Sequence, residues 1–216
     1  MLYSATYTED VIQYARKIVG DFKMFQMKKE ALKLKGVKNL KLKCQDDMKD
    51  EFVMHMHTKL EKAMCMVFVN KKESAAQLQS RLKVQGIAAN ILIGALETTE
   101  RDKMIDDFRQ GVFTTLISTN VLARGIDVPE VDIVINYDVP MIKRCGFYDP
   151  DYANFMHRVG RTGRFGTDGL ALTLMGTEID EESVALIAQH YSIDINEISD
   201  FDELAKIYGE MRQDLV

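Results

Sequence analysis

The sequence predicts an α/β domain of three layers, in which a mostly parallel sheet carries helices on both faces. Two observations predict this class. Short apolar runs alternate with longer segments of helical period along nearly all of the 216 residues, and this alternation is typical of parallel strands joined by crossover helices. With 46% apolar and 28% charged residues, the chain is also large enough to bury one sizeable core.

The strands are predicted from short apolar runs and from alternation. The run at 64–69 is apolar throughout, which is expected of a strand buried on both faces. One long stretch, from Pro140 to about Asp151, shows neither period, and we expect it to be irregular. The predicted strands cover residues 22–27, 40–42, 64–69, 87–93, 115–118, 131–137 and 169–175.

The helices are predicted from a period near 3.6 residues and from their end signals. Thr8 is a candidate N-cap for the first helix. Gly86 and Gly111 follow two other helical segments and mark their ends. The predicted helices cover residues 9–20, 48–62, 71–85, 97–110, 151–160, 179–190 and 201–213.

Charge and cysteine content narrow the class of protein. The formal net charge is −5, but nine lysines and one arginine fall between Arg16 and Lys43, which is as consistent with a solvated face as with a surface that follows phosphates. The three cysteines show no metal-ligand or disulfide spacing, so we expect no metal site and a reducing compartment. No apolar run approaches 18 residues, and we expect no membrane contact and a place in the cytoplasm or nucleus.

The densest chemical signal is the octet His157-Arg158-Val159-Gly160-Arg161-Thr162-Gly163-Arg164. Its three arginines are spaced by three residues, which on a helix would place them on one broad face. Guanidinium groups bind phosphate oxygens with two parallel hydrogen bonds. The two glycines disfavour a continuing helix, so either the segment ends early or something approaches its backbone closely. The octet therefore predicts outward-pointing guanidinium groups that bind a polyphosphate; a basic face that makes surface salt bridges is the alternative.

A second segment, from Thr119 to Pro129, follows a predicted strand. Thr119 and Asn120 stand at the carboxyl end of that strand, where ligands of parallel sheets bind and where backbone donors hold phosphates. Asp127 is a candidate for accepting hydrogen bonds from ribose hydroxyls. By itself, this aspartate would more simply stabilise a turn.

These segments together resemble those of superfamily 2 helicases, and of DEAD-box RNA helicases in particular. The octet resembles motif VI, 119–129 resembles motif V, 67–72 resembles motif IV, and Ser4-Ala5-Thr6 is similar to motif III. Residues 97–111 are similar to the family segment that touches the nucleic-acid backbone through an arginine, here Arg101. The chain departs from the common family pattern at Ile93-Gly94-Ala95 and at Thr98.

The resemblance implies that residues 9–216 form the C-terminal RecA-like domain of an ATP-dependent RNA helicase. Residues 1–8 would then be the end of a preceding RecA-like domain and the linker. No GxxxxGK followed by Ser or Thr occurs, and no Asp-Glu-Ala-Asp. We therefore expect a piece of a longer enzyme, in which ATP with Mg²⁺ is bound mainly by the N-terminal domain, and we expect this piece alone to be inactive.

The resemblance also implies a role for each matched residue. Arg161 and Arg164 would act as arginine fingers on the nucleotide, and His157 and Arg158 would couple the nucleotide site to RNA. The nucleotide would further contact Asp127 and Gly125. RNA would be bound by Thr119, Asn120, Arg101, Asn70 and Lys71.

Within the family, the closest resemblance is to the nuclear-pore mRNA-export subfamily. This resemblance rests on the amino-acid sequence of residues 119–127, on the long connection from Pro140 to Phe155 and on the acidic C-terminal segment 201–207. The implied partners are single-stranded RNA or a short duplex bound without regard to sequence, the N-terminal domain, and a nuclear-pore export factor with inositol phosphate. We expect a monomer. A helicase of the translation-initiation type and a non-catalytic RNA- or protein-binding module of the same fold are the alternatives.

Overall fold

The computed structural model describes residues 9–20, 22–24, 36–60, 63–94, 96–119, 130–144, 146–163 and 167–213. The chain divides into two compact units, Met1–Lys33 and Leu34–Val216. This division lies well after the boundary expected between residues 8 and 9, so that α1 (Glu9–Val19) groups with the first unit. Ser4-Ala5-Thr6 lies outside the described residues, and its assignment to a preceding domain stays a prediction.

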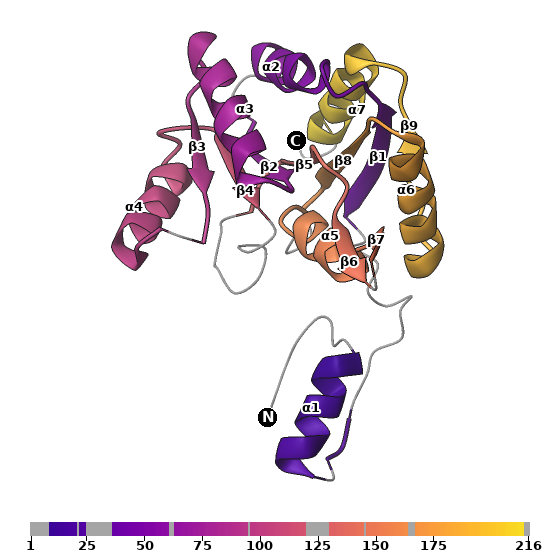
Figure 1. Ribbon diagram of the computed structural model, residues 1–216. Helices are drawn as coiled ribbons and strands as arrows, with labels where there is room; N and C mark the ends of the chain where they lie inside the picture. The colour runs from indigo at the N-terminus through magenta and orange to yellow at the C-terminus, as the bar shows by residue number, and fades with distance from the viewer. Residues whose placement is uncertain are drawn as a thin grey trace. The chain divides into compact units, whose positions relative to one another are not determined.

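The larger unit contains a seven-stranded sheet in which all paired strands run parallel (Figure 1). The strand order is β3-β4-β2-β5-β8-β1-β9. The predicted three-layer architecture is confirmed, because helices cover both faces. The strands are β1 (Val37–Lys43), β2 (Cys65–Val69), β3 (Ala89–Leu92), β4 (Thr115–Thr119), β5 (Ile133–Asn136), β8 (Gly169–Met175) and β9 (Asn196–Glu197).

Two hydrophobic clusters show how the sheet is covered. In β2, Cys65, Val67 and Val69 belong to one cluster, whereas Met66 and Phe68 belong to the other, so a fully apolar strand supplies both layers. The first cluster packs under α2 (Lys49–Lys59), α3 (Lys72–Val84) and α7 (Phe201–Gln213). The second packs under α4 (Thr98–Arg109), α5 (Tyr152–Val159) and α6 (Glu178–Tyr191).

Most predicted elements are present within one to three residues of their expected ends. The strand expected at 22–27 is an exception, because residues 22–24 are not in a strand and the rest lies outside the described part. The stretch expected to be irregular contains an antiparallel ribbon of β6 (Met141–Arg144) and β7 (Phe147–Pro150). The short strand β9 was not predicted either. Among the described residues, no helix is both long and apolar enough to cross a bilayer.

Candidate functional site

The carboxyl ends of β2 and β4 bring two predicted site residues together. Val69 pairs with Thr119 in the parallel register, so Asn70 comes directly after the residue beside Thr119. The Thr119 side chain is buried, and its hydroxyl oxygen has no hydrogen-bond partner among the described residues. A covered hydroxyl without a partner is costly, which makes it a candidate for contact with a ligand. Asn120, which was expected beside it, lies outside the described residues.

Asn70 is held by three hydrogen bonds within the domain. Its backbone N–H donates to Asp138 Oδ2 at 2.7 Å, and its side-chain amide donates to the Val139 carbonyl at 2.8 Å. Its side-chain oxygen accepts from Arg158 Nη2 at 2.9 Å. Both polar ends of the Asn70 side chain are therefore engaged internally. The next residue, Lys71, is the exposed N-cap residue of α3.

Arg158 lies completely inside the domain, and the expectation that it points outward is wrong. Its Nη1 donates to the Asp138 carbonyl at 2.7 Å and to Asn136 Oδ1 at 3.3 Å, and its guanidinium carbon lies 5.2 Å from the centre of the Phe68 ring. Burial lowers the Arg158 pKa to about 9, partly offset by the charge of Asp138. The side chain thus stays charged near neutral pH and joins β5, α5 and the loop after β2.

Arg161 also differs from the expectation. Its side chain is only 7% exposed. Its backbone N–H donates to the Arg158 carbonyl at 3.0 Å, and its own carbonyl accepts from the N–H of Val131 at 3.1 Å. Val131 precedes β5, so the backbone of Arg161 lies at the amino end of that strand and not at the carboxyl edge, where Thr119 and Asn120 were expected to hold phosphates.

The glycines of the octet behave as predicted. The helix ends at Val159 with Gly160 as its C-cap, and Gly163 has φ of 67°, in the left-handed region. A Cβ on Gly163 would lie 3.2 Å from the Gly36 carbonyl oxygen and would overlap the Val37 side chain. The interpretation that the segment ends early and is approached closely is confirmed. Arg158 is part of this helix, whereas Arg161 lies beyond its end.

The remaining predicted residues fall into two groups. Arg101 lies in the first turn of α4, which follows β3 and so begins near the same carboxyl edge. Its Nη2 donates to the Leu96 carbonyl at 3.0 Å, and its Nε is covered without a hydrogen-bond partner in the described part of the chain. His157 is partly buried on α5. Arg164, Asp127 and Gly125 lie outside the described residues, and their roles stay predictions.

A family model described as the helicase conserved C-terminal domain matches residues 48–166. The chain belongs to this helicase family. The ATP-dependent RNA helicase DBP5 of Lodderomyces elongisporus is 38% identical over 212 residues, which are 96% of this chain and 41% of that protein. DBP5 of Candida albicans is 36% identical and is covered to 38%. The helicase domain thus spans about 40% of the length of these curated relatives.

Solved structures extend the comparison to the fold. Saccharomyces cerevisiae Dbp5 bound to RNA and ADP BeF3 superposes with a TM-score of 0.86 at 35% identity, over 96% of this chain and 54% of that one. The C-terminal domain of the DEAD-box protein Dbp5 superposes with a TM-score of 0.73 at 36% identity, over 81% and 98% of the two chains. The RecA-like fold and the DEAD-box resemblance are confirmed.

Sequence reasoning missed a buried polar cluster in this helicase domain. Lys49 and Asp50, at the start of α2, are 3% and 6% exposed. Asp50 accepts a hydrogen bond of 2.9 Å from the Tyr137 hydroxyl, and burial together with this bond raises the Tyr137 pKa. Arg81 of α3 also pairs with Asp50. The cluster therefore holds Tyr137, the residue before Asp138, in place. Its burial could not be predicted, because charged residues at the start of a helix are usually exposed.

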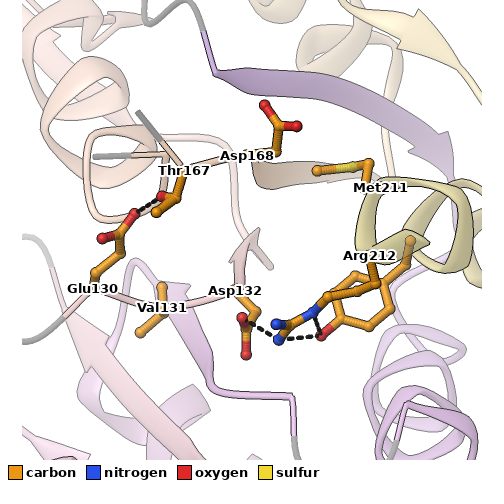
Figure 2. A pocket seen from close by; sticks show the side chains of 8 residues that line it. Glu130, Val131, Asp132, Thr167, Asp168, Met211 and Arg212 are labelled. Carbon is orange, nitrogen blue, oxygen red and sulfur yellow. Dashed lines mark hydrogen bonds and ion pairs between the residues drawn. The ribbon is translucent and has the colours of Figure 1, made fainter. Parts of the chain in front are cut away.

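A hollow of about 260 Å³ lies at the opposite edge of the helicase domain, near the amino ends of β5 and β8 (Figure 2). Asp132 forms an ion pair with Arg212 of α7, and the Arg212 Nη2 also donates to the Tyr208 hydroxyl at 3.0 Å. Thr167 donates to Glu130 across its rim. No predicted site residue lines it; its lining residues are Glu130, Val131, Asp132, Thr167, Asp168, Tyr208, Met211 and Arg212.

Proposed function

We propose that this chain is the C-terminal RecA-like domain of an ATP-dependent DEAD-box RNA helicase that acts in mRNA export. The observation that carries the proposal is the meeting of three distant segments at one place. Thr119 and Asn70 end neighbouring strands, and Arg158 of the octet is hydrogen-bonded to Asn70. The similar yeast Dbp5 structure, which contains RNA and ADP BeF3, supports the same assignment.

RNA would bind along the carboxyl edge through its phosphates. The Thr119 hydroxyl is buried without a hydrogen-bond partner among the described residues, Lys71 supplies an exposed charge, and Arg101 lies in the first turn of the neighbouring helix. Asn70 would serve as the clamp that holds this loop, because its own amide is already engaged. Phosphate contacts carry no base information, so binding would be independent of sequence and weakened by salt.

The nucleotide would lie between this domain and a preceding RecA-like domain, which would hold most of ATP and Mg²⁺. ATP supplies a transferable phosphoryl group, and arginine side chains stabilise the charge that develops on it. Arg161 fits this role with a restricted reach, since its backbone is fixed on both sides and its side chain is largely covered. Arg164, Asp127 and Gly125 complete the proposed contacts. The enzyme would act as a monomer in the cytoplasm and nucleus, at the nuclear pore.

A chimera tests the helicase assignment. The matching part of Saccharomyces cerevisiae Dbp5 is replaced by this chain, and ATP turnover is measured with and without RNA. We expect RNA-stimulated turnover from the chimera and none from this chain alone. Stimulated hydrolysis by the chain alone would contradict a site shared between two domains. A folded chimera that binds RNA without turning over ATP would favour the non-catalytic binding module.

The export assignment has a separate test. Saccharomyces cerevisiae Dbp5 structures include complexes with Gle1 and IP6, and one with Nup159 as well. We propose that this chain binds a pore export factor of the Gle1 kind together with an inositol phosphate. Gle1 immobilised on beads should retain the chain more strongly when IP6 is added. Absence of retention under both conditions would favour the translation-initiation type of helicase.

A further inference from the structure

The ribbon formed by β6 and β7 exposes two large aromatic side chains. Phe147 is 75% exposed and Tyr148 is 66% exposed. Lys143 and Arg144 on the opposite strand are exposed as well. Exposed aromatic rings are side chains on which the bases of single-stranded nucleic acid can stack. In the described part of the chain, these four side chains make no hydrogen bond or ion pair with the sheet, with Asn70 or with the octet.

The register of the ribbon places each ring opposite a positive charge. Arg144 pairs with Phe147, and Lys143 pairs with Tyr148, in the antiparallel ladder. Directly opposite residues share a face, and successive residues point to opposite faces. Each face of the ribbon therefore presents one aromatic ring beside one cation. On one face, the Lys143 ammonium lies 5.9 Å from the centre of the Tyr148 ring.

The ribbon begins beside the clamp at Asn70. The Asn70 amide donates to the Val139 carbonyl, and Met141 follows two residues later. The base is closed by a hydrogen bond of 2.8 Å from the N–H of Asp151 to the Pro140 carbonyl. Asp151 also caps α5, and the ribbon lies near α5 and α6 (Figure 1). Two residues of chain and a four-residue strand together span roughly 20 Å at most, so the rings lie within that distance of the carboxyl edge.

We propose that the β6–β7 ribbon is a base-stacking platform for single-stranded RNA, which extends the phosphate-binding edge. A base stacks on Phe147 or Tyr148, while Arg144 or Lys143 pairs with a neighbouring phosphate. Stacking on an aromatic ring accepts any base, because every base has a π face. The proposal rests on the proposed function for its ligand, and it adds contacts to bases where the carboxyl edge contacts only phosphates.

The charges favour RNA over a protein partner. Both rings stand opposite cations, and the one acidic residue in the described part of the ribbon, Asp149, pairs with Ile142 nearer its base. Polyanions with exposed π faces match this pattern, since cation and ring then each have a partner. A protein partner would instead need an acidic side chain beside each apolar contact to pair with these cations.

The test compares an oligouridine of about twelve nucleotides with an abasic ribose-phosphate chain of equal length. Affinity of the whole 216-residue chain is measured by fluorescence anisotropy at low salt. The double variant Phe147→Ala with Tyr148→Ala should bind oligouridine about tenfold more weakly than the wild type, a loss at the lower end of what one base stack contributes. Its affinity for the abasic chain should not change. Tyr148→Phe, which keeps the ring, should bind like the wild type.

Control variants separate this proposal from the proposed function. Val84→Ala truncates an apolar side chain of α3 that is 83% exposed, and it should change the affinity for neither oligouridine nor the abasic chain. Thr119→Val should weaken binding of both ligands, because it acts on phosphates. If Thr119→Val weakens both and the double variant weakens neither, the ribbon proposal is overturned and a protein contact explains the rings. If the wild type binds neither ligand, both proposals are overturned.

Discussion

Replacing Arg158 with alanine should destabilise the domain strongly, even though arginine is ordinarily a surface residue. The side chain is fully buried and donates to Asn136, Asp138 and Asn70. Removing it leaves the side-chain oxygen of Asn136 and the carbonyl of Asp138 without this donor. Each buried acceptor that loses its partner costs about 1–3 kcal/mol, and the space left by the side chain adds to the cost.

An opposing effect reduces this loss. The Arg158 pKa falls from 12.5 to about 9 because burial disfavours the charge. A fall of this size corresponds to about 5 kcal/mol of penalty, which alanine no longer incurs. We expect the lost hydrogen bonds and packing to outweigh the relief, so that Arg158→Ala lowers the free energy of unfolding by about 3 kcal/mol. Arg158→Lys should be no better, because an ammonium keeps the burial penalty but cannot reach three acceptors with one fork.

Urea unfolding followed by far-ultraviolet circular dichroism measures this change, and is suited to a chain without tryptophan. Arg109→Ala is the matched control. The Arg109 side chain is 43% exposed and pairs with Asp106 at 3.1 Å, so its loss should cost less than about 0.5 kcal/mol. If Arg158→Ala lowers the free energy of unfolding by less than about 1 kcal/mol, the reasoning is refuted, because the buried hydrogen bonds of Arg158 would then contribute no net stability.

The other predictions concern turnover, RNA, pH and the turn after α5. In the Dbp5 chimera, Arg161→Ala should reduce RNA-stimulated ATP turnover by about 10³-fold or more. Circular dichroism of the same variant should show that the fold is kept. Near-normal turnover would contradict the role proposed for Arg161. Thr119→Val should weaken RNA binding by about 1 kcal/mol for every sequence tested by anisotropy, and a sequence-dependent loss would contradict a phosphate contact. Burial lowers the His57 pKa from 6.5 to about 4, so the unfolded chain takes up the proton first. Stability is then fully present above pH 6.5 and falls by about 2 kcal/mol towards pH 5, and His57→Gln should remove this part of the pH dependence in urea titrations. Gly163→Ala should cost about 2 kcal/mol or more in the same titrations, because φ is positive there and Val37 occupies the space; an unchanged midpoint would show that the turn can move.

The strands of the larger unit were predictable because burial on both faces leaves a simple trace in the sequence. Residues 65–69 and 169–175 are buried throughout, and they are apolar apart from Gly169 and Thr173. The β6–β7 ribbon left no such trace. It has no face packed as a strand of the main sheet, so its side chains show neither an apolar run nor an alternation of apolar and polar residues.

The candidate site was predictable in its residues and less so in its geometry. Spacing alone placed Asn70 and Thr119 at strand ends, and the parallel register brings these ends together. Spacing could not show that Arg158 is buried, because charge normally signals exposure and its acceptors come from β5 and from the loop after β2. The burial of Arg161 could not be predicted either. The spacing argument assumed that Arg158 and Arg161 lie on one helix, but the helix ends at Val159, two residues before Arg161.

The contact between Gly163 and the start of β1 has a consequence for how strain would travel. Gly36 and Val37 belong to the start of the larger unit, and both lie close to Gly163. The Gly36 carbonyl also accepts from the N–H of Gly169 at 2.7 Å. A displacement of Gly36 or Val37 would therefore act both on the Gly163 turn, which follows Arg161, and on Gly169 at the start of β8.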